Sequence, residues 1–98
     1  MSDGPQIAIN LPEAHRAGVY SDVVMVWHSE WGFTLDFLAQ VQPVDENAET
    51  APFQVVSRVR IPPAVIFPLV KTLHENLSNY EKKFGPIPEP GNHGGGET

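Results

Sequence analysis

"RIPPAVIFPLVKTLHENLSNYEKKFG", residues 60–85, decides the fold, because it predicts one long amphipathic helix. Its apolar side chains recur at steps of three and four residues, which places them on one side of a helix. Gly85 followed by Pro86 is a strong stop signal for that helix. The residues of this apolar stripe are Ile66, Leu69, Val70, Leu73, Leu77, Tyr80 and Phe84.

The prolines leave two possible starts for this helix. Pro62 cannot donate to a β-ladder and ends the preceding strand, whereas Pro63 suits the first helical position. Pro68 inside a helix would remove a hydrogen bond and clash with the preceding turn, which costs about 3 kcal/mol. Either residues 64–67 form a separate short turn before a helix that begins at Pro68, or one helix begins at Pro63 and bends. We favour a break or kink near Phe67, because residues before proline avoid helical geometry.

Four segments upstream of the helix have the patterns of strands. Residues 7–11 alternate between apolar and polar, which predicts a short strand with one buried face. Residues 19–28 are apolar at both parities and need cover on both sides. Residues 33–41 alternate more cleanly, and residues 53–61 carry arginines on one face, which suits a sheet edge.

The turn between the two central segments decides which side chains share a face. A loop of residues 30–32 would set Trp27 opposite Leu35, so that apolar side chains meet. A loop one residue shorter would set Trp27 opposite Thr34. We therefore expect the three-residue loop, with Gly32 in the left-handed backbone conformation of a bulged turn.

These elements predict an α+β protein in which a small antiparallel sheet of three to four strands carries one long C-terminal helix on one face. The predicted domain covers residues 6–85, between a disordered lead at 1–5 and a disordered Pro/Gly-rich tail at 86–98. The acidic stretch at 43–50 is expected to be a solvated connector.

Composition narrows the functional classes. The formal net charge of −6 is opposite to that of most nucleic-acid-binding domains, and it also disfavours anionic membrane surfaces. The chain has no cysteine, which excludes disulfides, thiolate metal sites and cysteine nucleophiles. The N-terminus lacks the pattern of a signal peptide, and no stretch approaches the roughly 18 apolar residues of a membrane span. We expect a cytoplasmic protein with neither a nucleic-acid nor a membrane partner.

The histidines do not predict a metal site. His15, His28, His74 and His93 are too scattered for ligand spacing, and His74 is followed directly by Glu75, which points away from it on a helix. We expect no metal and no cofactor.

Two carboxylates and one guanidinium are the remaining candidates for chemistry. In the expected register Asp22 and Asp36 share the second face of the sheet, where a carboxylate pair could act as acid and base. Arg58 lies on the neighbouring strand, and a salt bridge to Asp22 or Asp36 explains all three residues without catalysis. No nucleophile or phosphate-binding glycine loop accompanies them. We therefore expect no catalytic residues and a non-enzymatic protein, and keep a small enzyme built on these residues as a weaker alternative.

One helix can cover one sheet face, which leaves the other face in need of a partner. An exposed apolar patch there would be unusual for a monomer, so the pattern predicts a homodimer or larger assembly. The alternatives are a curled sheet or cover by the N-terminal segment. Trp31, at the loop tip, either folds back on the sheet or contacts a partner. The hypothetical interface residues are Tyr20, Val24, Val26, Trp31, Leu38 and Phe67.

Several short motifs together resemble the uncharacterised bacterial and archaeal family called domain of unknown function 3467. The resemblance covers about residues 7–88. It implies a small antiparallel sheet with a C-terminal helix and supplies no catalytic residues. One departure is "IPPAVIFP", which stands where relatives usually have a Ser-Pro-type helix cap, so the helix start is the doubtful point. The motifs are Gly18-Val19-Tyr20, Leu35-Asp36-Phe37, Val56-Ser57-Arg58, Asn76, Tyr80-Glu81 and Phe84-Gly85.

A shorter stretch, "PPAVIFP" at residues 62–68, is similar to the segment leading into the long helix of SecB-type export chaperones. That similarity implies an apolar groove for extended polypeptide. The sequence as a whole therefore predicts a small self-associating interaction module. The alternative is a SecB-like polypeptide-binding chaperone or adaptor.

Overall fold

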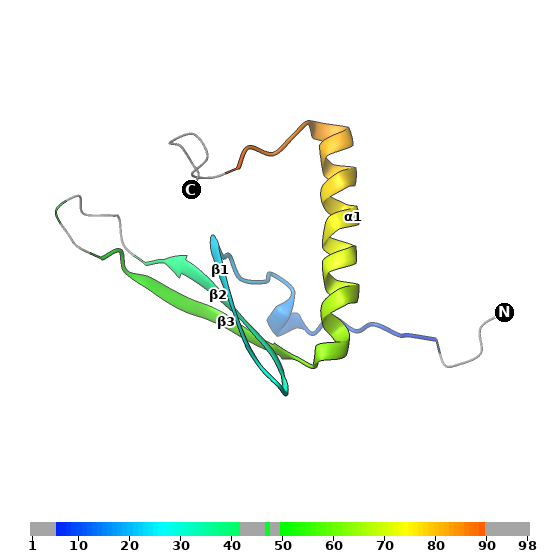
Figure 1. Cartoon of the computed structure of the whole chain (residues 1–98), viewed down its shortest axis with the longest axis horizontal. Coiled ribbons are helices and arrows are strands. Elements are labelled where there is room, and N and C mark those ends of the chain that lie inside the picture. The colour runs from blue at the N-terminus through cyan, green and yellow to red at the C-terminus, as the bar shows by residue number, and fades with distance from the viewer. Residues whose placement is uncertain (1–5, 42–46, 48–49, 90–98) are drawn as a thin grey trace. The chain divides into compact units, whose positions relative to one another are not determined.

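The computed structural model describes residues 6–41, 47 and 50–89, which form a three-stranded antiparallel sheet and one long helix (Figure 1). The strand order is β1-β2-β3, so β1 and β3 are the edges. This architecture confirms the predicted fold class, with three strands. The elements are η1 (Glu13–His15), β1 (Val23–Ser29), β2 (Gly32–Gln40), β3 (Phe53–Ile61), η2 (Pro63–Val65) and α1 (Ile66–Phe84).

Two compact units divide the chain. One comprises Met1–Trp27 with Thr34–Val59 and holds most of the sheet, and the other comprises His28–Phe33 with Arg60–Thr98 and holds α1. The placement of the helix on a sheet face stays a prediction. The predicted lead at 1–5, most of the acidic connector and residues 90–98 of the predicted tail lie outside the described residues.

The predicted strand at residues 7–11 does not form within the chain. Residues 6–12 have no regular secondary structure, and the side chains of Ile7 and Ile9 are 87% and 89% exposed. A strand requires a neighbour for its backbone N–H and C=O groups, and residues 6–11 make no backbone hydrogen bond to another described residue. The alternating pattern is present, but the single chain supplies no partner for it.

The hairpin between β1 and β2 has the shorter of the two loops considered. Only residues 30 and 31 separate the strands, and Gly32 is the first residue of β2. The indole Nε1–H of Trp27 donates to Oδ2 of Asp36 at 2.9 Å. Since successive side chains alternate between faces, this bond places Trp27 and Asp36 on the same face, whereas the three-residue loop would separate them. The expected register was wrong because matching apolar side chains ignored the hydrogen-bond donor of the indole.

Gly32 is required for the close approach of β2 to β3. The left-handed backbone that we expected for it does not form. Its φ of 159° is close to extended backbone, and a Cβ at this position would lie 2.5 Å from the carbonyl oxygen of Ile61. Atoms do not approach that closely without a backbone shift, so any side chain here would push the two strands apart.

The observed register defines two faces in the part of the sheet that belongs to the first unit. We call the face shared with Asp36 the ion-pair face; its members are Val23, Met25, Trp27, Thr34, Asp36, Leu38, Val56 and Arg58. We call the opposite face the apolar face; its members are Val24, Val26, Leu35, Phe37, Ala39, Phe53, Val55 and Val59. Leu38 was expected to share a face with the two β1 valines and instead lies on the other side.

The helix begins with a 3-10 turn, η2, which passes into α1 at Ile66. Val65 is the N-cap, so Pro68 is the third residue of the helix. The first four N–H groups of a helix have no intrahelical acceptor, and a proline there removes no bond. The helical segment therefore begins at Pro63, as one alternative held, with a 3-10 first turn that continues directly into α1, and Phe67 lies inside α1 and not at a break before it. At the other end Gly85, with φ of 96°, donates its N–H to the carbonyl oxygen of Glu81.

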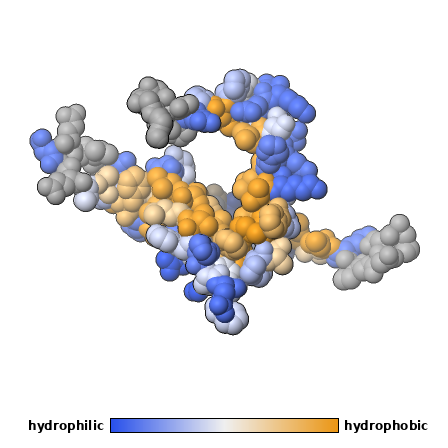
Figure 2. All heavy atoms as spheres, viewed as in Figure 1, coloured by the Kyte–Doolittle hydropathy of each residue, from blue (hydrophilic) through white to orange (hydrophobic). Residues whose placement is uncertain are grey.

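Burial in the described residues reverses the usual distribution. No apolar side chain among them is buried, whereas Asp36 is 3% exposed. Figure 2 shows hydrophobic residues gathered along the strands on the surface in view. The described residues include no helix that is both long and apolar enough to cross a membrane.

Candidate interaction surface

A three-residue polar cluster lies at the centre of the ion-pair face. The carboxylate of Asp36, on the middle strand, accepts a hydrogen bond from the Trp27 indole on one edge strand. From the other edge strand Arg58 donates through Nε to Oδ1 at 2.6 Å and through Nη2 to Oδ2 at 2.9 Å. The carboxylate thus joins all three strands through charged and neutral hydrogen bonds. This confirms the predicted cross-strand salt bridge, with Asp36 as the acid.

The electrostatics of this cluster favour the charged forms of both partners. The hydrogen bonds from Arg58 lower the pKa of Asp36, and the Trp27 indole and the charge of Arg58 lower it further, although burial opposes the shift. The same contact with Asp36 raises the pKa of Arg58. At neutral pH the carboxylate is therefore ionised and fully engaged as an acceptor.

This arrangement is poorly suited to acid–base catalysis. A general base needs a pKa near the working pH and a free lone pair directed at a substrate. The side chain of Asp36 is only 4% exposed and already accepts three hydrogen bonds. The hydrogen-bond partners of Asp36 are Trp27 and Arg58 and not Asp22, whose backbone N–H donates to the carbonyl oxygen of Leu38 at 2.9 Å. The structure does not bring the two carboxylates together as a pair.

Around the polar cluster, β1 presents apolar side chains on both of its sides. Its five apolar residues, Val23 to Trp27, are between 37% and 55% exposed. Three of them flank the ion pair, and Val24 and Val26 lie on the opposite face. β1 therefore presents half-exposed apolar side chains on both faces of the sheet.

The predicted interface residues fall into separate groups. Val24 and Val26 lie together on the apolar face, and Leu38 lies on the ion-pair face. Tyr20, which precedes β1, is 77% exposed. Trp31 is 81% exposed at the hairpin tip, where its backbone N–H donates to Oγ of Ser29.

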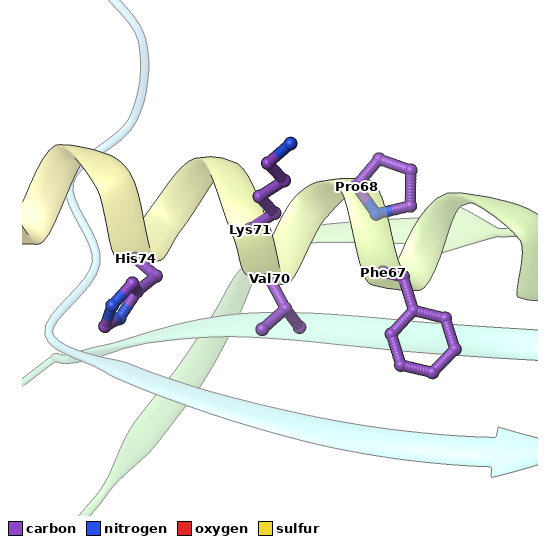
Figure 3. A pocket seen from close by; sticks show the side chains of 5 residues that line it. All are labelled: Phe67, Pro68, Val70, Lys71 and His74. Atoms are coloured by element: carbon purple, nitrogen blue, oxygen red, sulfur yellow. The ribbon is translucent and has the colours of Figure 1, made fainter.

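On α1 a shallow apolar hollow occurs near the start of the helix. It is lined by Phe67, Pro68, Val70, Lys71 and His74 (Figure 3). The side chains of Phe67, Val70 and His74 point to one side of the helix, and that of Lys71 points to the other. The predicted interface residue Phe67 is 81% exposed here. The apolar side of the helix is thus open at its beginning.

The same side of α1 stays exposed further along. Leu73, Leu77 and Phe84 are between 42% and 66% exposed. Near the end Tyr80 and Phe84 pack with ring centroids 4.9 Å apart, which fixes their positions on the stripe. The helix therefore presents a continuous apolar side.

Sequence reasoning missed the role of Trp27, which was assigned to an apolar set. The available signal was the indole N–H, because a tryptophan in a sheet needs an acceptor for it. In the register with Trp27 opposite Thr34, Asp36 is the diagonal neighbour on the same face and supplies that acceptor. Within the described part of the chain, no three histidine, aspartate or glutamate side chains are grouped closely enough to hold a metal ion.

Comparisons with known proteins agree with the motifs. A search of curated proteins found no significant match. A search of solved structures likewise found none. A family model described as a protein of unknown function (DUF3467) matches residues 1–89. Because this match covers most of the 98 residues, the chain belongs to the DUF3467 family.

Proposed function

We propose that this protein is a non-enzymatic interaction module that self-associates, with a second copy covering apolar surface that one chain leaves in water. The observation that carries the proposal is the exposure of apolar side chains on both sides of β1, in a structure whose described residues bury no apolar side chain.

The sheet has two faces with apolar side chains to be covered. A strand alternates its side chains, so Val24 and Val26 point away from Val23, Met25 and Trp27. The 19 residues of α1 make a rod roughly 28 Å long, which can lie on one face of a sheet. Whichever face it covers, the other keeps exposed valines or an exposed tryptophan. Covering a half-exposed side chain of this size contributes roughly 1 kcal/mol.

The chemistry of this surface supports a second copy of the chain as the partner. The charges of Asp36 and Arg58 are paired with each other, and the residues that flank this pair on β1, Val23, Met25 and Trp27, are uncharged. Such a surface is complementary to a copy of itself, which is the basis of two-fold interfaces. A net charge of −6 argues against phosphate-rich partners.

The absence of catalysis is part of the proposal, and the engaged state of Asp36 supports it. Three hydrogen bonds occupy the carboxylate of Asp36, which is the buried one among the described residues. A reaction at this site would first have to break the contacts that join the strands.

The test is the mass of the full chain in solution. Sedimentation equilibrium or size exclusion with light scattering, from about 1 to 200 μM, should give at least twice the 10.8 kDa of one chain. A mass of 10.8 kDa throughout that range contradicts self-association. Such a monomer, if it also bound an apolar dye in its native state, would favour the polypeptide-binding alternative.

A further inference from the structure

We infer that residues 6–11, here called the arm, add as a strand to the β1 edge of a second copy. This inference rests on the proposed self-association and specifies which parts of the two copies meet. The unpaired arm of one copy and the open sheet edge of the other would then pair with each other.

The arm has the pattern of a strand but no neighbour. Ile7, Ile9 and Leu11 alternate with polar or small residues, and prolines at positions 5 and 12 bracket the segment. Its backbone makes no hydrogen bond to another described residue. Its three apolar side chains are 54% to 89% exposed. A segment of this kind gains both backbone hydrogen bonds and cover for one face when it joins a sheet edge.

The two edges of the sheet differ in how well they are protected. β1 reads VVMVWHS and contains no Asp, Glu, Lys, Arg or Pro. β3 carries Arg58 and Arg60, and Pro62 follows its end. Charges and prolines are the usual means by which an edge strand avoids pairing with another chain. Because β1 lacks both, it is the edge open to a further strand, and the uncharged arm meets no repulsion there.

The arm reaches a second copy and not its own β1. Both segments belong to the same compact unit, and in that unit they are not paired. The chain between them is taken up by η1, whose turn is held by the N–H of His15 on the carbonyl oxygen of Pro12. Gly18, with φ of 73°, adds a left-handed bend that favours glycine. These local structures direct the chain between arm and β1 without forming a hairpin.

The pairing matches the two segments in length and in face. Six arm residues span about 20 Å, comparable to the seven residues of β1. Centring Ile9 on Val26 places Ile7 and Leu11 beside the apolar face in either strand direction. The family model includes the arm, since its match begins at residue 1. The arm is therefore part of the domain that the family shares.

The experiment uses single cysteines, which are unambiguous because the natural chain has none. Ile9→Cys and Val26→Cys chains are mixed, allowed to exchange, and oxidised with a glutathione couple. Cross-strand neighbours have Cα atoms about 4.5–5.5 Å apart, within the range that a disulfide bridges. We expect the mixed disulfide to form at least ten times faster than that between Ile9→Cys and Val55→Cys. Val55 is a matched control, because it is 44% exposed on the apolar face of the other edge strand.

Three other products would overturn the inference. A Val26→Cys homodimer that forms as fast indicates pairing between two β1 edges. A fast disulfide to Val55→Cys indicates the β3 edge. A monomeric disulfide in the Ile9→Cys/Val26→Cys double variant indicates pairing within one chain. Circular dichroism of each variant confirms that it is folded.

A second measurement separates this inference from the proposed function. Deleting residues 1–11 should raise the dissociation constant of the assembly at least tenfold. If the full chain is monomeric, self-association itself fails. If the full chain assembles while the deletion leaves its dissociation constant unchanged, the arm is not part of the interface.

Discussion

The polar centre of the sheet is buried, whereas the apolar side chains of the edge strand β1 are exposed. Asp36 is buried, and every strand supplies or accepts a hydrogen bond there. On β1, by contrast, side chains that favour burial remain about half exposed. Buried polar groups must be paired within the molecule, whereas apolar groups can be covered by any molecule that fits. The polar groups at the centre are thus paired within one chain, whereas the apolar side chains of β1 are the surface that the proposed assembly would cover.

The largest effect is expected from placing a charge on the apolar face. Val24→Asp should halve the mass of the assembly or make the chain insoluble, because an assembled interface would bury an unpaired carboxylate. In a single chain Val24 is already 52% exposed, so the substitution there should have little effect. Light scattering and the melting temperature measure the two consequences.

Gln54→Asp is the control for that substitution, since Gln54 is exposed on the opposite edge strand β3, at a position of the ion-pair face. It should leave the mass unchanged. A Val24→Asp protein that kept both its mass and its melting temperature would show that the apolar face is not an interface.

Truncating the helix stripe should have the next largest effect. Leu77→Ala is expected to lower the free energy of unfolding by about 2–5 kcal/mol, as for side chains that are covered in the complete protein. Urea unfolding measures this change, with Asn79→Ala on the opposite side of α1 expected to stay within about 0.5 kcal/mol. A negligible change for Leu77→Ala would mean that the stripe stays in water.

Within the polar cluster, removing the guanidinium of Arg58 should destabilise the fold more than neutralising the carboxylate of Asp36. Arg58→Met leaves a side chain that is 4% exposed with one indole donor, whereas Asp36→Asn leaves a guanidinium that is 57% exposed and can be solvated. We expect the urea midpoint to fall about twice as far for Arg58→Met, because an unsatisfied buried group is the more costly one. Arg60→Met is the control for loss of a positive charge from β3. Equal falls for both variants would show that the cluster is solvated.

The smallest effect is the pH dependence of that cluster. Because Arg58 lowers the pKa of Asp36 in the folded chain, the ionised carboxylate stabilises the fold above the unfolded value of about 4. That contribution is lost as pH falls through the lower folded value. The difference in urea midpoint between the natural protein and Asp36→Asn should therefore be constant from pH 7 to pH 5 and shrink at pH 3. A difference in urea midpoint that persisted at pH 3 would contradict the link between the ionisation of Asp36 and the stability of the fold.

The parts of the fold that local patterns determine could be predicted from the sequence. The alternation of β2 and β3, the helical stripe and the stop at Gly85 each follow from spacing along one segment. The strand at residues 7–11 could not be decided in this way, because a strand exists only where another strand accepts it. The helix start depended on whether Pro68 falls within the first turn, where its missing N–H has no consequence.

The candidate surface was predicted in part. The predicted register of its strands was wrong for one physical reason. A salt bridge from Arg58 to Asp36 was among the alternatives, but the register was chosen by matching apolar side chains. That criterion treated Trp27 as purely apolar. The indole N–H and the carboxylate of Asp36 favour the other register, and a hydrogen bond in a protected place outweighs the matching of side chains that remain half exposed.

The position of Trp27 beside Asp36 also makes the intrinsic fluorescence of the protein a probe of the ion-pair face. The chain has two tryptophans, and Trp31 lies at the exposed hairpin tip. A Trp31→Phe chain would fluoresce from a single indole held against a carboxylate at the centre of the sheet. Its emission would move to shorter wavelength when another molecule displaces water from the ion-pair face, so a titration of protein concentration would show whether assembly covers that face.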